Sequence, residues 1–314
     1  MSTRSQRDDT AALAASITRA ASRQTYYTIR FLADRDRVDD AYRAYAYFRW
    51  LDDELDSAEG SNAGSSDFVS RQRSLLESLY DGVQVRAADG HEQLLVDLVQ
   101  RSGADHGGLK IYLRNMMEVM AFDAARRGRV ISQAELNRYT WHLASAVTEA
   151  LHYFIGRDCS APQDHTRYLA VSAAHITHML RDTFDDLRAG YYNIPHEVLA
   201  WGRISPADIG SEAYRAWVRE RVQLARAYFD EASGCLHRVK NPRCRLACLA
   251  YMGRFTGILD AIERDDFLLR PAYPETKGLT ALLRAAFGLL AGSPERRRRG
   301  RGPGRTYSQE RTLE

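Results

Sequence analysis

The stretch "AYRAYAYFRWLDDELDS", residues 41–57, joins an aromatic, apolar half to an acidic half. Its apolar residues recur at three- and four-residue spacing, which is typical of an amphipathic α-helix. In such a helix Asp52 and Asp56 share one face, with Asp53 one step round. Like charges at this spacing destabilise an isolated helix by about 0.2–0.5 kcal/mol. The cluster is therefore either a solvated helix end or a site that needs a cationic partner.

A second acidic cluster favours the cationic partner. The segment "HMLRDTFDDLRAG", residues 178–190, places Asp182 and Asp186 four residues apart with Asp185 between them, again after an apolar stretch. Two helices of this kind can face one another across a cavity, and a metal ion relieves the repulsion. Hard carboxylate oxygens favour Mg²⁺ or Mn²⁺, and Mg²⁺ commonly bridges carboxylates to phosphate oxygens. The pair of clusters predicts metal-assisted handling of a diphosphate.

The rest of the chain has the same helical period, and runs that alternate like strands are nearly absent. Short breaks rich in Gly, Ser, Asp and Pro separate the periodic segments. This pattern predicts an all-α, single-domain multi-helix bundle with a central active-site cavity. The expected helices cover residues 10–32, 37–57, 67–85, 91–103, 108–127, 132–156, 164–189, 211–238, 242–266 and 276–291.

Composition limits the remaining choices. The 314 residues are 45% apolar and 27% charged with a net charge of +3, which suits a helical domain over 10–292. The tail 293–314, rich in Arg and Gly, has almost no apolar content, so we expect it to be disordered and solvated. No nucleic-acid partner is expected. No apolar run reaches the ~20 residues of a membrane span. Four cysteines without CxxC spacing fit core positions in a reducing, cytoplasmic location.

The two acidic segments resemble known motifs. "YAYFRWLDDELD" and "HMLRDTFDDLRAGYYNIP" are similar to the two aspartate-rich motifs of the squalene/phytoene synthase family, and the similarity runs from about residue 18 to about residue 270. The resemblance implies the class I isoprenoid synthase fold. It also implies an Mg²⁺-dependent prenyltransferase of isoprenoid biosynthesis, which condenses two prenyl diphosphates (farnesyl or geranylgeranyl) head to head through a cyclopropyl intermediate. A squalene-type product needs a nicotinamide reductant, NADPH, and no sequence feature decides its use.

The resemblance also assigns residues position by position. The metal ligands it implies are Asp52, Asp56, Asp182 and Asp186, with Asp53, Asp185 and His178 as further candidates. The catalytic residues it implies are Tyr139, Arg49, Arg181 and Tyr45. The substrate-binding residues it implies are Tyr26, Arg49, Tyr45, Ser145, Thr148, His178 and Arg181. Glu118, with Asp123 five residues on, lies where the family often has an acidic residue.

Two departures from the family pattern concern the cavity walls. Ser145 and Thr148 replace two glycines, and bulkier side chains there shorten or redirect a prenyl pocket. His175 and His178 stand where the family has Gln and Asn, and His178 shares a helix face with Asp182. A neutral imidazole there either ligates a metal, hydrogen-bonds a phosphate or is a core histidine. These changes leave the acidic site intact and bear on the identity of the product.

Carbocation chemistry needs a dry, π-rich cavity. Aromatic residues at helical spacing are candidates for its walls: Phe48, Trp50, Tyr26, Tyr27, Trp141, Tyr153 and Phe154. Oily substrates and products predict work at a peripheral membrane surface without a span. The oligomeric state cannot be read from the sequence.

Three other functions fit parts of the sequence. The first is a family member that ionises one prenyl diphosphate and then cyclises or hydrolyses it. The second is a helical di-metal oxygenase, suggested by Glu149 and His152 in a Glu-x-x-His motif with His175 and His178 nearby, although such sites need two of these motifs. The third is a non-catalytic scaffold, which would not need to keep the acidic residues. Nucleotide binding is not supported, since no GxxxxGK[ST] loop occurs.

Overall fold

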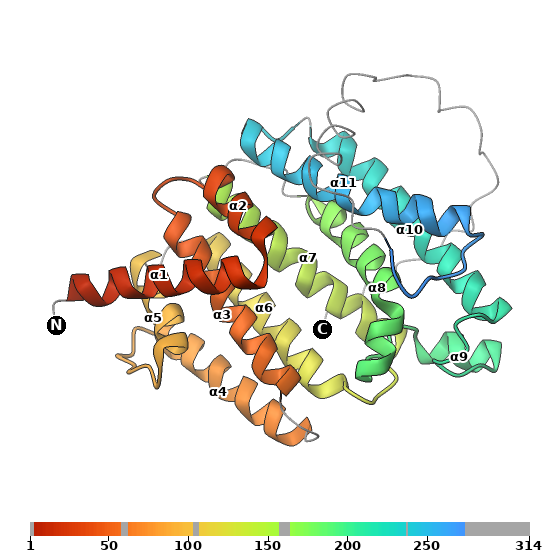
Figure 1. The fold of residues 1–314 in the computed structure, drawn as a ribbon, viewed down its shortest axis with the longest axis horizontal. Coiled ribbons are helices and arrows are strands. Elements are labelled where there is room, and N and C mark those ends of the chain that lie inside the picture. The colour runs from red at the N-terminus through yellow and green to blue at the C-terminus, as the bar shows by residue number, and fades with distance from the viewer. Residues whose placement is uncertain (1–2, 58–61, 103–106, 157–163, 237, 274–314) are drawn as a thin grey trace.

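The computed structural model describes residues 3–57, 62–102, 107–156, 164–236 and 238–273, and these ranges are almost entirely helical (Figure 1). The all-α prediction is confirmed. The helices are α1 Thr3–Ala21, α2 Arg23–Leu32, α3 Val38–Ser57, α4 Asn62–Tyr80, α5 Gly90–Ser102, α6 Gly107–Arg126, α7 Gln133–Gly156, the 3₁₀ helix η1 His165–Tyr168, α8 Leu169–Ala189, α9 His196–Gly202, α10 Glu212–Leu236 and α11 Pro242–Arg264.

The predicted single helix over 10–32 is wrong, because the chain breaks at Ser22. Ser22 has an extended backbone (φ −152°, ψ 101°), and its hydroxyl accepts a hydrogen bond from the Thr25 amide at 3.1 Å. A serine in this position caps the first turn of a new helix. The break turns α2 away from the line of α1, so that α2 becomes a separate ten-residue element.

Other boundaries also differ from the prediction. The helix expected over 67–85 is α4, which begins earlier, at Asn62, and ends at Tyr80. The helix expected over 164–189 begins with a 3₁₀ turn that Asp164 caps. The seven-residue α9 was not predicted, because two turns after Pro195 are too short to show a period. The predicted helix over 276–291 and the tail 293–314 lie outside the described residues.

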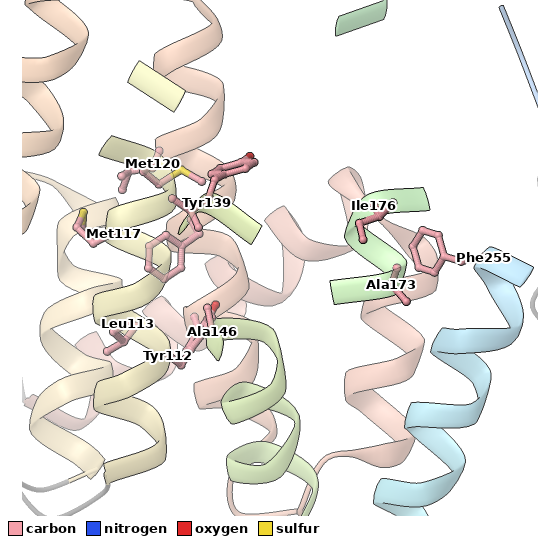
Figure 2. Close-up of a cluster of buried hydrophobic side chains, with 14 of the residues drawn as sticks. Tyr112, Leu113, Met117, Met120, Tyr139, Ala146, Ala173, Ile176 and Phe255 are labelled. Atoms are coloured by element: carbon pink, nitrogen blue, oxygen red, sulfur yellow. The ribbon is translucent and has the colours of Figure 1, made fainter. Parts of the chain in front are cut away.

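Helices α6, α7 and α8 lie next to one another at the centre, with α3 against α6 on one side and α10 and α11 against α8 on the other (Figure 1). Buried side chains from all these helices form one continuous core. Figure 2 shows part of it, with Met117 and Met120 of α6, Tyr139 of α7, Ile176 of α8 and Phe255 of α11. The core therefore holds both acidic segments, on α3 and α8, against the central pair α6 and α7.

A small backbone junction fixes the exit of α8 beside the end of α6. Gly190 ends α8 with a left-handed backbone (φ 85°), a conformation that favours glycine. The Gly128 amide donates to the Gly190 carbonyl at 2.8 Å, and Val130 forms an isolated parallel β-bridge with Tyr192. The second acidic segment is thereby anchored to the α6–α7 connection. None of the helices in the described ranges is both long enough and apolar enough to cross a membrane.

Candidate active site

An apolar cavity of about 440 Å³ lies between α2, α3, α6 and α7. Along α3 its lining runs from Ala41 and Ala44 to Arg49 and Asp52, so charge is found at one end of an otherwise oily space. Tyr45 also lines the cavity, one turn before Arg49. Its volume falls within the range of small-molecule sites. The first motif thus forms the polar end of a cavity that can hold an aliphatic chain.

The first motif is an ion-pair cluster on α3. Arg49 Nη1 lies 3.2 Å from Asp52 Oδ2, and Arg49 also contacts Asp53. Partial burial raises the pKa of Asp52 to about 6, and repulsion from Asp56 acts in the same direction, while Arg49 opposes both. Tyr45, Arg49, Asp52 and Asp56 lie on one helix face, as their spacing predicts. This face carries more negative charge than Arg49 neutralises.

The second motif, on α8, has the same excess of negative charge. Arg181 donates to both carboxylate oxygens of Asp182, at 2.5 and 2.7 Å. His178 Nε2 lies 3.2 Å from Asp182 Oδ2. Asp186 accepts a hydrogen bond from Asn193 Nδ2 at 2.6 Å, yet burial and repulsion from Asp182 raise the pKa of Asp186 to about 6. Asp186 therefore lacks a full counter-charge within the described residues.

The middle aspartate of each motif has a different environment from its neighbours. Asp53 is exposed and contacts Arg49, and Asp185 is exposed and contacts Arg188 three residues on. Both carboxylates thus pair with an arginine of their own helix at the solvent side. Their assignment as further metal ligands stays a prediction.

A buried chain of hydrogen bonds connects Tyr139 on α7 with Asp186 on α8 through α6. The Tyr139 hydroxyl donates to Asp123 at 2.9 Å, and Arg126 Nε donates to the same carboxylate at 2.7 Å. Arg126 Nη1 then donates to Asn193 Oδ1 at 2.8 Å, and Asn193 donates to Asp186. The chain fixes the relative positions of α6, α7 and the segment after α8.

Asp123 is also the electrostatic link between the two motifs. Burial raises its pKa, Arg126 lowers it, and repulsion from Asp56 raises it further. Its charge in turn raises the pKa of both Asp52 and Asp186. Asp123 thus contributes a carboxylate to the space between α3 and α8. Glu118, by contrast, pairs with Arg73 of α4 at 2.6 Å at the surface.

Sequence reasoning identified Asp123 only as a neighbour of Glu118 and missed Arg126 and Asn193. Arg126 lies in "AARRGR", where nothing distinguishes it from the arginines beside it, and Asn193 lies in the loop "GYYNIP". What distinguishes both side chains is their burial in the fold. No spacing rule predicts that burial from the sequence.

Tyr139 is enclosed by groups that keep its hydroxyl protonated. Burial raises its pKa well above the ordinary value, and the charge of Asp123 acts in the same direction. Its ring stacks on Phe122 with centroids 4.9 Å apart and meets the His175 ring edge-on at 5.0 Å. The Arg126 guanidinium lies 4.9 Å from the centre of the Tyr139 ring. Tyr139 is therefore a fixed hydrogen-bond donor to Asp123.

Ser145, Thr148 and His175 are buried polar residues with unusual surroundings. Neither the Ser145 nor the Thr148 hydroxyl has a hydrogen-bond partner among the described residues, and the same holds for His175 Nε2. Other buried helical hydroxyls, such as those of Thr177 and Thr183, donate to the carbonyl four residues back. Burial lowers the pKa of His175 to about 3, so its ring is neutral. Ser145 and Thr148 do not line the 440 Å³ cavity.

The predicted aromatic walls are correct only in part. Phe48 and Phe154 line the cavity, together with Tyr112, which was not predicted. The prediction is wrong for Trp141 and Tyr27, which are exposed. The remaining aromatic candidates pack elsewhere: Tyr26 on Tyr42, Trp50 on His91, and Tyr153 under Arg37. The role of Tyr26 in substrate binding stays a prediction.

The two residues of the Glu-x-x-His motif, Glu149 and His152, contact other side chains of the protein. Both carboxylate oxygens of Glu149 accept from Arg167, at 2.7 and 2.9 Å, and one also accepts from Tyr168 at 3.0 Å. His152 faces the thiol of Cys244 at 3.6 Å. The Glu149 carboxylate thus pairs with a buried guanidinium, which disfavours the oxygenase hypothesis.

Within the described ranges, no three His, Cys, Asp or Glu side chains come close enough to hold a metal ion by themselves.

Comparison with known proteins identifies relatives along most of the chain. A family model described as squalene/phytoene synthase matches residues 18–278. Chloroplastic phytoene synthase 3 of Zea mays is 28% identical over 274 residues, which are 83% of this chain and 62% of the maize protein. Chloroplastic phytoene synthase 2 of Solanum lycopersicum is 26% identical over 253 residues, 78% of each chain. The chain thus spans less than two thirds of the length of the maize relative.

Solved structures show the same fold at low sequence identity. A dehydrosqualene synthase in complex with a ligand superposes with a TM-score of 0.69 and 14% identity, over 91% of this chain and 99% of that one. Squalene synthase HpnC from Alicyclobacillus acidocaldarius superposes with a TM-score of 0.65 and 16% identity, over 83% and 96%. The predicted class I isoprenoid synthase fold is confirmed.

Proposed function

The chain belongs to the squalene/phytoene synthase family, and from this premise we propose that it is a prenyltransferase condensing two prenyl diphosphates head to head. The observation that carries the proposal is the apolar cavity whose charged end is formed by Arg49 and Asp52 of the first motif. Such a cavity accommodates a prenyl tail and leaves its diphosphate beside the acidic residues.

Mg²⁺ fits the donor set of the two motifs. Asp52, Asp56, Asp182 and Asp186 offer only hard carboxylate oxygens, and burial together with mutual repulsion raises the pKa of Asp52 and of Asp186, which supports a cation between them. These four residues would hold the metal together with diphosphate oxygens and water. When bound, Mg²⁺ neutralises the charge that develops on the departing diphosphate. Mn²⁺ suits the same ligands.

The chain's own residues would serve the first step, cleavage of the carbon–oxygen bond to diphosphate. Arg49 and Arg181 present guanidinium groups beside the two motifs, and each can bind a phosphate oxygen in a charge-assisted hydrogen bond. Tyr45 lies one turn before Arg49 in the cavity wall. Phe48, Tyr112 and Phe154 would face the allylic cation with π-rich surfaces and exclude water.

The second step joins two substrates. The double bond of the second molecule attacks the allylic cation, a cyclopropyl diphosphate forms, and one proton and one diphosphate are released. We assign Tyr139 a positioning role in this scheme, because its hydroxyl donates a hydrogen bond to the partly buried Asp123. It holds Asp123 in place between the motifs. Analysis of the products would identify the prenyl chain length. It would also decide whether NADPH reduces the cyclopropyl intermediate.

One observation favours the alternative in which a single prenyl diphosphate reacts. Ser145 and Thr148 stand where the family has glycines, and neither buried hydroxyl has a hydrogen-bond partner among the described residues, although both lie outside the 440 Å³ cavity. Extra side-chain volume and polarity there would hinder a second prenyl chain, and the cation would end as an alcohol or a cyclic product. The same experiment separates the two reactions.

The test is to incubate the protein with farnesyl or geranylgeranyl diphosphate and Mg²⁺, with and without NADPH. Released diphosphate is assayed, and the hexane extract is analysed by mass spectrometry. Condensation predicts C30 or C40 products, whereas C15 or C20 alcohols or cyclic hydrocarbons would contradict it. Asp52→Asn and Asp182→Asn are expected to abolish release, and Glu54→Gln, an exposed neighbour, to leave it unchanged. Release that persists in both Asn variants would refute the assigned site.

A further inference from the structure

Helix α2 has two different faces and no fully buried residue. Its inner face lines the apolar cavity with Thr25, Thr28 and Ile29. Its outer face carries Tyr27 and Phe31, whose side chains are 43% and 72% exposed. Among the described residues, α2 thus separates part of the cavity from the surface on that side.

The two outer aromatic residues form a defined apolar surface. Tyr27 and Phe31 are four residues apart, and their rings stack with centroids 6.0 Å apart and planes at 11°. The start of α11 adjoins the end of α2, where Arg243 Nη1 donates to the Leu32 carbonyl at 3.4 Å. Leu246, one turn on from Arg243, is 43% exposed. Single exposed apolar residues are common, but neighbouring ones of this size mark an interaction surface.

The charged residues on α2 itself have one sign, although the exposed Asp36 and Asp39 follow in the α2–α3 connection and at the start of α3. Helix α2 carries Arg23 and Arg30, both exposed, and no acidic residue. Arg19, at the end of α1, is also exposed and lies 5.7 Å from the centre of the Tyr26 ring. Aromatic residues flanked by arginines on a short amphipathic helix are typical of segments that lie in the interface of an anionic membrane. The arginines suit the lipid phosphates, and the aromatic rings suit the boundary between headgroups and acyl chains.

We propose that the outer face of α2, formed by Arg23, Tyr27, Arg30 and Phe31, docks on an anionic lipid bilayer. Tyr27 and Phe31 enter the boundary between headgroups and acyl chains, and the two arginines contact lipid phosphates. The docking itself depends only on this surface. Docking would place α2, which lines the cavity, against the bilayer that supplies the oily substrates and receives the oily products. This purpose rests on the proposed prenyltransferase function.

The experiment uses the full chain and vesicles of phosphatidylglycerol mixed with phosphatidylcholine, or of phosphatidylcholine alone. Co-sedimentation measures binding, and thermal unfolding checks that each variant is folded. The double variant Tyr27→Ser with Phe31→Ser should bind anionic vesicles about tenfold more weakly than wild type. Arg23→Gln with Arg30→Gln should lose the preference for phosphatidylglycerol. Trp201→Ser is the matched control, because Trp201 is 79% exposed and its helix, α9, lies on the opposite side of the bundle from α2 (Figure 1).

Several outcomes would overturn the proposal. The first is failure of the full chain to bind anionic vesicles. The second is equal binding by wild type and the Tyr27/Phe31 variant. The third is a dimer in gel filtration that this variant abolishes, without vesicle binding, since the face would then join two copies. Vesicle binding without diphosphate release would leave the docking surface standing and refute the proposed function. Diphosphate release without vesicle binding that depends on Tyr27 and Phe31 would support the proposed function and refute the docking surface.

Discussion

Asp186 should destabilise the fold at neutral pH, so replacing it with Asn should make the metal-free protein more stable. The Asp186 carboxyl has a pKa of about 6 in the fold against an ordinary value of 3.8. Because the folded-state pKa is the higher one, the folded protein binds more protons than the unfolded chain between these values. Stability is therefore lost as the pH rises through that window, and the full penalty is present above pH 6.

The magnitude follows from the difference between the two pKa values. A tenfold difference in proton affinity is about 1.4 kcal/mol, so full burial would give about 3 kcal/mol at pH 7.5. Asp186 is partly exposed, and solvent screening reduces the expected gain of Asp186→Asn to about 1–2 kcal/mol. The linkage relation predicts that the gain falls to about half at pH 5 and nearly disappears at pH 4. The Asn side chain can still accept the hydrogen bond from Asn193.

Urea denaturation in EDTA at pH 7.5, 5 and 4 measures this effect. Asp185→Asn is the matched control: that carboxylate is exposed and paired with Arg188, so its replacement should change stability by less than about 0.5 kcal/mol. Asp186→Asn should also reduce diphosphate release, because Asp186 is a proposed metal ligand. A variant that is less stable than wild type at pH 7.5, or a gain that does not depend on pH, would refute the reasoning.

Three other substitutions test separate parts of the fold and site. Glu149→Gln removes the carboxylate charge that pairs with the buried Arg167 guanidinium, and we expect urea denaturation to show a loss of about 3–5 kcal/mol. Tyr139→Phe removes the 2.9 Å hydrogen bond to Asp123 and should cost about 1 kcal/mol in stability. Diphosphate release by that variant should fall by more than its stability explains, and unchanged turnover would contradict the positioning role. Gly202→Ala places a Cβ 2.6 Å from a side chain of α10, and thermal unfolding should show a loss of about 1–3 kcal/mol.

The all-α fold and the acidic faces of α3 and α8 were predictable from the sequence, because both depend on spacing within one helix. Asp52 and Asp56, or Asp182 and Asp186, share a face whatever packs against them. The break at Ser22 was not predictable in this way, because the apolar period continues across it. A serine inside such a run is either a helical residue or a cap, and only the packing of α2 decides between them.

Contacts between helices were the part that the sequence did not reveal. Tyr27 and Phe48 look alike as members of aromatic, helical segments, yet Phe48 lines the cavity and Tyr27 faces outward. Arg126 and Asn193 connect Asp123 with Asp186 of the second motif, through a hydrogen bond between residues 67 positions apart in the chain. A pattern within one helix identifies which side chains share a face, but it does not identify what that face meets.

The separation of α2 from α1 at Ser22 also has a consequence for the dynamics of the protein. Because α2 buries none of its side chains fully, lifting it from α1, α3 and α11 exposes only partly buried apolar side chains, those of Tyr26, Ile29 and Leu32. Segments of this kind undergo local opening at a lower free energy than the global unfolding reaction. Amide hydrogens of α2 should therefore exchange with deuterium well before those of α3 and α7, in a reaction insensitive to low concentrations of denaturant. The fold would in this way combine a stable central bundle with one readily detached element.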